Sequence, residues 1–153
     1  MDTTTILESS KALLIPWTTR VEQPEPGRLD IYLPAEKIVE AVQAMVSAGG
    51  WHLSAITGMD IPETGEMTDG QIELLYHFCQ RVAVVTLRIA VNYGMPIAPS
   101  ICGVIPSAVL YEREAIEMFG VILEGSPMRE RLLLSDDWPD YVYPLRKSFK
   151  GIE

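Results

Sequence analysis

The sequence predicts an α+β fold with two layers, in which a mixed sheet of about four to five strands packs against two main helices and an extended C-terminal tail follows. Several segments alternate apolar and polar residues with period two, and two others place apolar residues at helical spacing. Prolines then interrupt the last part of the chain. With 153 residues, of which 48% are hydrophobic, the chain can bury one compact core. We expect this α+β core domain to span residues 29–125.

Residues 1–28 are expected to form a flexible N-terminal segment. Few periodic apolar positions precede Gly27, and the run from Glu22 to Gly27 is polar and rich in proline. The apolar stretch from Lys11 to Trp17 is short and lacks the basic flank of a signal peptide. No run reaches the roughly 20 apolar residues that a membrane span requires. We therefore expect a soluble, cytoplasmic chain.

The first strand and the first helix are expected directly after this segment. Residues 29–33 alternate apolar and polar side chains, which predicts a strand. Pro34 then opens a segment whose apolar residues recur at helical spacing, namely Ile38, Val42, Met45 and Val46. Two glycines, Gly49 and Gly50, are expected to end this helix.

Three further strands and a loop are expected in the middle of the chain. Residues 51–57 predict a strand, and residues 58–70 predict a loop because they combine glycines, a proline and several acids. Residues 72–78 alternate strictly, and residues 82–91 predict the next strand of a hairpin. Three prolines in residues 93–106 exclude a central strand there, so this stretch is expected to cross the surface irregularly.

The second main helix is expected from Ser107 to Phe119. Ser107 is suited to cap its start, and Gly120 is suited to end it. Beyond residue 121 we expect no helix, and residues 126–153 are expected to form an extended C-terminal strap.

Composition excludes several classes of function. The formal net charge of −9 disfavours binding to nucleic acid or to anionic lipid. The two cysteines, Cys79 and Cys102, and the two histidines, His52 and His77, provide no ligand set for a metal or an iron–sulfur cluster. The sequence contains no catalytic motif and no glycine-rich dinucleotide fingerprint. We therefore expect no catalytic, cofactor-binding or metal-binding residues in this chain.

The helix from Ser107 to Phe119 carries one charged residue on its apolar side. Glu112 falls within the apolar arc, whereas Leu110 falls on the polar side. Because an unpaired buried carboxylate is costly, we expect Glu112 to pair with an arginine of the tail, at position 129, 131 or 146. The alternative is a proton-handling carboxylate with a raised pKa. Leu110 is either an ordinary exposed leucine or an anchor against another chain.

The C-terminal tail combines basic and aromatic side chains without a helical or strand pattern. Its basic residues are Arg129, Arg131, Arg146, Lys147 and Lys150, and its aromatic residues include Trp138, Tyr141 and Tyr143. Arginine and aromatic side chains are typical anchors of protein interfaces. We therefore expect the tail to contact a partner protein, and the alternative is a solvated tail folded on its own domain.

Three linked motifs identify a family resemblance. The stretch from Pro106 to Gly125, with E-R-E-A-I-E-M-F-G at residues 112–120, resembles the signature of the complex I 30-kDa subunit family, the C subunit of NADH-quinone oxidoreductase. Residues 131–138 and 144–147 follow in the order and spacing of that family, and I-T-G-M-D at residues 56–60 agrees more loosely. The departures are Leu110 in place of Trp, Glu117 and Ser148 in place of Asp, and Ser126 in place of His.

The resemblance implies a peripheral, non-redox subunit of a respiratory NADH:quinone oxidoreductase. Its partners would be the quinone-site subunit (49-kDa, hydrogenase-large-like) and neighbouring iron–sulfur subunits, which would hold NADH, flavin, iron–sulfur clusters and quinone, or nickel–iron. The complex would lie on the cytoplasmic side of the cell membrane and couple electron transfer to ion pumping. The residues expected to fix the fold or the interface are Leu110, Glu112, Arg113, Glu114, Arg131, Trp138, Pro144, Leu145, Arg146 and Lys147.

Three alternatives stay open at the level of sequence. The same module occurs in membrane-bound hydrogenases, formate hydrogenlyases and F420H2 dehydrogenases. A stand-alone protein-binding adaptor is a second alternative. A free-standing enzyme that uses Glu112 or Glu114 as an acid or base is a third, although we expect the isolated chain not to be catalytic.

Overall fold

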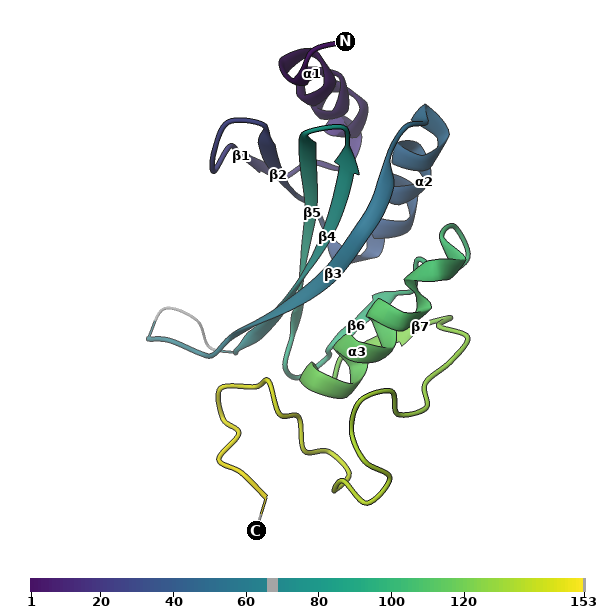
Figure 1. Cartoon of the computed structure of the whole chain (residues 1–153). Coiled ribbons are helices and arrows are strands. Elements are labelled where there is room, and N and C mark those ends of the chain that lie inside the picture. The colour runs from purple at the N-terminus through teal and green to yellow at the C-terminus, as the bar shows by residue number, and fades with distance from the viewer. Residues whose placement is uncertain (66–68, 153) are drawn as a thin grey trace.

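A five-stranded mixed sheet forms one layer of the structure, a computed structural model that describes residues 1–65 and 69–152 (Figure 1). The strands run in the order β1-β2-β5-β4-β3, with β2 parallel to β5 and the other neighbours antiparallel. Their bounds are β1 Arg20–Glu22, β2 Arg28–Tyr32, β3 His52–Ile61, β4 Gln71–Gln80 and β5 Ala83–Asn92. The predicted α+β class with a mixed sheet of four to five strands is confirmed.

Three α-helices form the second layer, one more than the sequence predicted. They are α1 Thr3–Leu14, α2 Ile38–Ala48 and α3 Val109–Phe119. Figure 1 shows α2 and α3 along the same side of the sheet, with the C-terminal tail below α3. Residues 126–152 contain no helix or strand.

The prediction of a flexible segment over residues 1–28 was wrong. Helix α1 buries Ile6, Leu7 and Leu14, whose side chains are 6% exposed or less. The carboxylate of Asp2 caps the helix by accepting the backbone N–H of Thr5 at 2.8 Å. The apolar residues of this helix fall in two groups, at positions 6–7 and 12–14, and the buried Ser10 lies between them, so the apolar stripe is interrupted. The ordered core therefore begins well before residue 29, and β1 adds an edge strand.

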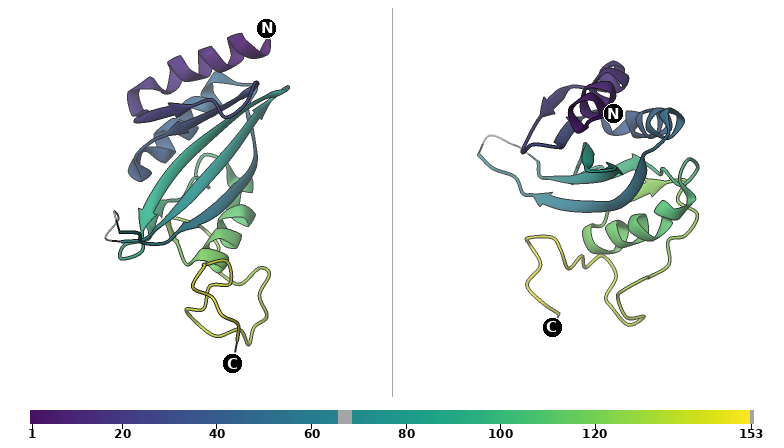
Figure 2. Two further views of the ribbon diagram at one scale, coloured as in Figure 1. Left: turned by 90° about the vertical axis from the view of Figure 1, so that its left-hand side faces the viewer. Right: turned by 45° about the horizontal axis from the view of Figure 1, so that its top comes forward.

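Alternation along the strands separates a covered face of the sheet from an open one. The side chains of β4 that point to the helices are fully buried, namely Ile72, Leu74, Tyr76 and Phe78. The opposite face is polar, and there the Arg88 guanidinium pairs with Asp30 at 3.0 Å and with Glu73. Figure 2 gives two further views of this two-layer arrangement. Burial of one face and ion pairing on the other explain the period of two that the sequence displayed.

Strand β3 is longer than the sequence predicted, because residues 58–61 continue it instead of opening a loop. Gly58 lets the ring of Phe119 pack directly over this extension, because a Cβ at that position would collide with the ring. Asp60 lies near the end of the strand and is 4% exposed. The part of the predicted loop at residues 66–68 lies outside the described residues.

A small parallel sheet replaces the irregular crossing expected for residues 93–106. Strand β6, Ile97–Pro99, pairs with β7, Ile122–Glu124, and Ala98 and Ile101 are buried. The prediction that Ser107 caps the second main helix was also wrong, because a 3-10 turn at Pro106–Ala108 leads into α3 without a side-chain cap. Gly120 ends α3 as predicted, with φ of +75°.

We expect His77 to make the stability of the protein depend on pH. Its ring bonds to Oγ1 of Thr57 at 2.8 Å and of Thr86 at 3.1 Å on the open face of the sheet. Burial lowers the pKa of His77 below its ordinary value of about 6.5, and two nearby arginines lower it further, against the opposing effect of Asp30. The unfolded chain therefore takes up this proton first as the pH falls. Stability from this site is complete above pH about 6.5 and is lost as the pH falls through the folded pKa.

The measurement is urea unfolding of the wild type and of His77→Gln between pH 7 and pH 5. The difference in unfolding free energy between the two proteins should shrink toward acidic pH. A difference that stays constant over this range would contradict the prediction.

Candidate docking interface

Helix α3 holds the C-terminal tail through two side chains that lie one turn apart. The Arg113 guanidinium donates to the backbone carbonyls of Glu130 at 3.1 Å and Arg131 at 3.0 Å. The Glu117 carboxylate accepts the backbone N–H groups of three consecutive residues, 132–134, at 3.1, 2.9 and 3.0 Å. Because these contacts go to backbone groups, they fix the path of the tail and do not depend on which side chains the tail carries.

Glu112 is fully buried, but the prediction that it pairs with a tail arginine was wrong. Its carboxylate accepts the Ser100 hydroxyl at 2.7 Å, the backbone N–H of Ile101 at 2.8 Å and the Cys102 thiol at 3.1 Å. Burial raises the pKa of the Cys102 thiol to about 11, and the bond to Glu112 adds to this shift. Hydrogen bonds from the loop before α3 thus compensate the burial of this carboxylate, and α3 is bound to that loop.

Arg146 fastens the end of the tail to the end of α3. Its Nε donates to the backbone carbonyl of Phe119 at 2.7 Å. Its guanidinium lies over the rings of Tyr93 and Tyr143, 5.2 and 4.9 Å from their centroids. A cation near the last carbonyls of a helix is favourable, and the two rings shield it from water. Arg146 therefore joins the helix, the tail and the loop after β5.

Asp60 provides a second attachment for the same part of the tail. One of its carboxylate oxygens accepts the backbone N–H of Lys147 at 2.7 Å. The other accepts the hydroxyl of Tyr93. Burial raises the pKa of Tyr93 to about 12, with the Asp60 bond as a further cause. The backbone N–H of Leu145 also donates to the carbonyl of Met118 at 3.1 Å.

The middle of the tail forms a compact loop of its own. The Arg131 guanidinium donates to the carbonyl of Ser135 at 2.6 Å and pairs with Asp140 at 3.2 Å. The indole N–H of Trp138 donates to the carbonyl of Val142 at 2.8 Å. Two of the residues predicted for the interface, Arg131 and Trp138, therefore shape the tail from within.

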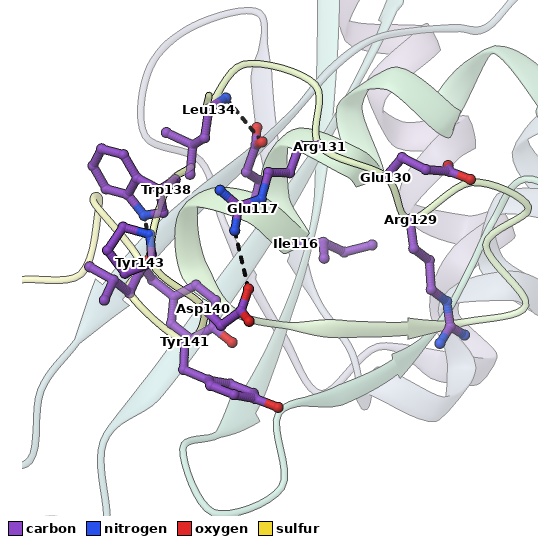
Figure 3. Close-up of a pocket in the computed structure, with 12 residues that line it drawn as sticks. Ile116, Glu117, Arg129, Glu130, Arg131, Leu134, Trp138, Asp140, Tyr141 and Tyr143 are labelled. Carbon is purple, nitrogen blue, oxygen red and sulfur yellow. Dashed lines mark hydrogen bonds and ion pairs between the residues drawn. The ribbon is translucent and has the colours of Figure 1, made fainter. Parts of the chain in front are cut away.

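A pocket of about 370 Å³ lies between α3 and this loop (Figure 3). Its apolar lining comes from Ile116, Leu134 and Trp138, and charged side chains surround these residues. Figure 3 shows the Arg131–Asp140 pair crossing the middle of the pocket. The contacts of Arg113 and Glu117 hold the tail in place against α3, and this fixes the two sides of the pocket relative to each other.

The remaining predicted residues do not form one cluster. Leu110 and Leu145 are each 53% exposed, and Pro144 is half-buried. Glu114 is exposed and has no ion pair within residues 1–65 and 69–152. It lines a small cavity of about 160 Å³ together with Leu145 and Phe119. Leu110 and Leu145 thus leave apolar side chains open to a partner.

Three residues of this interface could not be recognised from the sequence: Asp60, Tyr93 and Glu117. Asp60 lies in the I-T-G-M-D segment and Glu117 in the E-R-E motif, so both belong to the motifs that carry the family resemblance. Neither stands out as a contact for the tail, because carboxylates that accept backbone N–H groups leave no sequence pattern in their partners. Tyr93 stands before a segment with separate prolines at positions 96, 99 and 106, and no motif includes it.

The charge of the chain is unevenly divided. Residues 126–153 contain five basic and five acidic side chains, so the net charge of −9 belongs to residues 1–125.

Among the described residues, no three His, Cys, Asp or Glu side chains are grouped to hold a metal ion. No described helix has the length and apolar character needed to cross a membrane.

We expect Glu117→Ala to release the tail loop without unfolding the domain. The substitution removes the acceptor of three backbone N–H groups that are mostly exposed, so water replaces it and the loop loses its fixed path. Limited proteolysis should cut the variant within residues 129–140 at least several times faster than the wild type. Glu114→Ala is the matched control on the same helix. Equal cutting rates for Glu117→Ala and wild type would contradict this role.

The chain matches the family described as respiratory-chain NADH dehydrogenase, 30 Kd subunit, over residues 31–153. The C subunit of NADH-quinone oxidoreductase from Roseiflexus sp. (strain RS-1) is 30% identical over 151 residues, which cover 96% of this chain and 83% of that protein. Formate hydrogenlyase subunit 5 of Escherichia coli (strain K12) is 37% identical over 119 residues, which cover 76% of this chain. This chain spans only 19% of the length of formate hydrogenlyase subunit 5.

A solved structure of the membrane-bound sulfane sulfur reductase, an archaeal respiratory membrane complex, contains a similar chain. The two share 26% sequence identity with a TM-score of 0.79, over 95% of this chain and 86% of the other. The similarity therefore extends over the tail as well as the two-layer domain.

Proposed function

Because the chain belongs to the family of the respiratory-chain NADH dehydrogenase 30 Kd subunit, we propose that it is a docking subunit of a membrane-associated oxidoreductase complex. The observation that carries this proposal is the tail held in a fixed path by Arg113 and Glu117. That path leaves apolar side chains exposed, including Leu133 at 60% and Leu145 at 53%. An ordered surface of this kind is typical of a protein interface.

The partner in this proposal is the quinone-site, hydrogenase-large-like subunit, with iron–sulfur subunits beside it. The match to formate hydrogenlyase subunit 5 supports a neighbour of this kind. In that protein the segment similar to this chain is a small part of a much longer polypeptide, so the segment has a further part of the same protein next to it. The cofactors, namely NADH, flavin, iron–sulfur clusters and quinone, belong to the partner subunits in this proposal.

Two parent complexes are candidates. The first is an NADH:quinone oxidoreductase on the cytoplasmic side of the membrane, which the match to the Roseiflexus protein over 96% of this chain supports. The second is a membrane-bound hydrogenase or formate hydrogenlyase, which the 37% identity to formate hydrogenlyase subunit 5 favours. In both, the chain positions its neighbours and carries no electrons itself.

The two carboxylates that could serve as an acid or base fit this non-catalytic role. Glu112 is completely buried and its oxygens already accept three hydrogen bonds, so it has no path to a substrate. Glu114 is exposed on the helix surface, where no described basic group pairs with it. We therefore propose that neither carboxylate acts as a catalytic acid or base and that the isolated chain is not catalytic.

The test is purification of a tagged full-length chain from native membranes. A hydrogenase-large-like subunit should co-purify in equal amount, and the Arg113→Ala/Glu117→Ala variant should recover much less of it. Reduction of a quinone analogue by the purified complex, with NADH or with hydrogen as donor, then separates the two parent complexes. Recovery of the tagged chain alone, with full tagged protein in the eluate, would refute the docking function.

A further inference from the structure

We propose that Glu114 and the small pocket beside it bind a basic side chain, lysine or arginine, of the neighbouring subunit. This inference rests on the proposed docking function and names the chemistry of one of its contacts. The pocket has a volume of about 160 Å³ and lies between α3 and β3, the edge strand of the five-stranded sheet (Figure 1). Leu145 of the tail also lines it, so the pocket adjoins the proposed docking surface.

Helix α3 carries three carboxylates, and two of them already have partners. Glu112 accepts three hydrogen bonds from the loop before the helix. Glu117 accepts three backbone N–H groups of the tail. Glu114 is exposed and has no hydrogen bond or ion pair to the residues that the structure describes. Its carboxylate is therefore open to a group from outside the chain.

The helix itself provides no cation for Glu114. Side chains three and four positions apart are neighbours on a helix, and for Glu114 these are Leu110, Tyr111, Glu117 and Met118. None of them is basic, and Glu117 is a like charge that disfavours ionised Glu114 in the isolated chain. A cation from a partner would relieve this repulsion.

The basic residues nearest to Glu114 along the helix and the tail lie outside the pocket. Arg113 donates to backbone carbonyls of the tail, and Arg146 donates to the carbonyl of Phe119. Lys147 follows in the tail, but it does not line the pocket and forms no ion pair with Glu114. The charge of Glu114 is therefore left for a partner to neutralise.

The lining of the pocket selects a basic side chain. Glu114 is the one charged residue among the described residues that line it, and the others are Ile56, Thr57, Gly58, Ala115, Phe119 and Leu145. Lysine and arginine have a long apolar stem that suits such a lining and a charged end that suits a carboxylate. The net charge of −9 on residues 1–125 also attracts a basic surface.

The size of the pocket fits one side chain. A cavity of about 150 Å³ in a protein holds a group as large as benzene, so a pocket of about 160 Å³ accepts a single side chain and excludes a helix. A calcium or magnesium ion is a poorer occupant, because it requires several oxygen ligands and the lining offers one carboxylate.

Two exposed leucines border this site and would shield the ion pair. Leu110 lies one turn before Glu114 on the same side of α3, and Leu145 lines the pocket. Each of these leucines is 53% exposed. A partner that covers them excludes water from the pair between its basic side chain and Glu114, and this strengthens the attraction.

The experiment measures binding of the purified full-length chain to the complex isolated from cells that lack this subunit. Glu114→Gln should weaken binding about tenfold or more, and Glu114→Lys should weaken it further because like charges then meet. Glu8→Gln and Glu8→Lys are the matched controls and should bind as the wild type does. Glu8 is exposed on α1, at the opposite end of the molecule from the tail (Figure 1). Glu114→Gln binding as tightly as Glu8→Gln would overturn the inference.

The melting temperature of the isolated chain separates binding from folding. Glu114→Gln removes the repulsion from Glu117, so the melting temperature should stay equal or rise slightly. A fall of several degrees that accompanies the loss of binding would make Glu114 a structural residue and would overturn its role as a contact.

Leu145 tests the apolar part of the pocket. Leu145→Ser should weaken binding severalfold, because it removes apolar surface beside the ion pair, whereas Leu145→Met should bind as the wild type does. Unchanged binding of Leu145→Ser would show that the pocket is not covered by the partner.

Failure of this inference is distinguishable from failure of the proposed function. If the wild-type chain does not bind the complex, the docking function is refuted. If the wild type binds and the Glu114 variants bind equally well, docking stands and this pocket is not its contact. Dimerisation of the wild-type chain that Glu114→Lys abolishes would make a second copy the occupant, which also overturns the inference.

Discussion

Glu112→Ala is expected to lose about 3–5 kcal/mol of unfolding free energy, because three buried or partly buried donors lose their common acceptor. The backbone N–H of Ile101 is the most costly of these, since it has no alternative partner once the carboxylate is gone. The truncation also leaves a cavity at a site that is 0% exposed. Chemical unfolding of the isolated chain measures this loss directly.

Two further variants make the result specific. Glu112→Gln keeps one acceptor oxygen but turns an amide donor toward the other donors, so it should lose less than Glu112→Ala. Glu114→Ala, two positions along the same helix and exposed, should change stability by no more than about 0.5 kcal/mol. A stable Glu112→Ala variant whose assembled complex has lost turnover would instead indicate a catalytic carboxylate.

Gly120→Ala is expected to lose about 2–3 kcal/mol and to detach the end of the tail, because it combines backbone strain with overpacking. Gly120 has φ of +75°, where any Cβ is strained. A Cβ there would also collide with the ring of Tyr143, which packs against the end of α3 beside Arg146. The tail must move to make room, and this movement disrupts the hydrogen bond from Arg146 to Phe119.

A double-mutant cycle separates the two contributions. In the background of Tyr143→Ala the steric collision is absent, so Gly120→Ala should then cost only the roughly 1–2 kcal/mol of backbone strain. Gly103→Ala is the neutral control, because a Cβ at Gly103 meets no atom within 4 Å. Equal losses for Gly120→Ala in both backgrounds would show that Tyr143 does not press on this position.

These two residues connect the fold of the domain to the path of the tail, which carries the proposed docking surface. Glu112 fixes α3 against the loop that precedes it, and Gly120 lets the chain reverse tightly at the end of α3. The helix then offers Arg113 and Glu117 to the tail in a fixed position. A change at either residue is therefore expected to disturb docking through the position of the tail.

Most of the sheet and two helices were predictable because their signals are local. Strands β2, β4 and β5 alternate, α2 carries an apolar stripe, and Gly120 marks the end of α3. The family resemblance rested on motifs around α3 and was confirmed by the match over residues 31–153. Helix α1 escaped prediction because Ser10 interrupts its apolar stripe and because contact with distant parts of the chain buries it.

The sequence by itself determined that Glu112 would be buried, because helical periodicity alone places it on the apolar side of α3. Only the tertiary structure decided its partners, which are Ser100, Ile101 and Cys102 rather than a tail arginine. Only the tertiary structure decided the partners of Glu117 as well, because its carboxylate oxygens accept hydrogen bonds from backbone N–H groups. Every residue except proline carries such a group, so amino-acid identity does not reveal which ones a carboxylate binds, and only the path of the chain does.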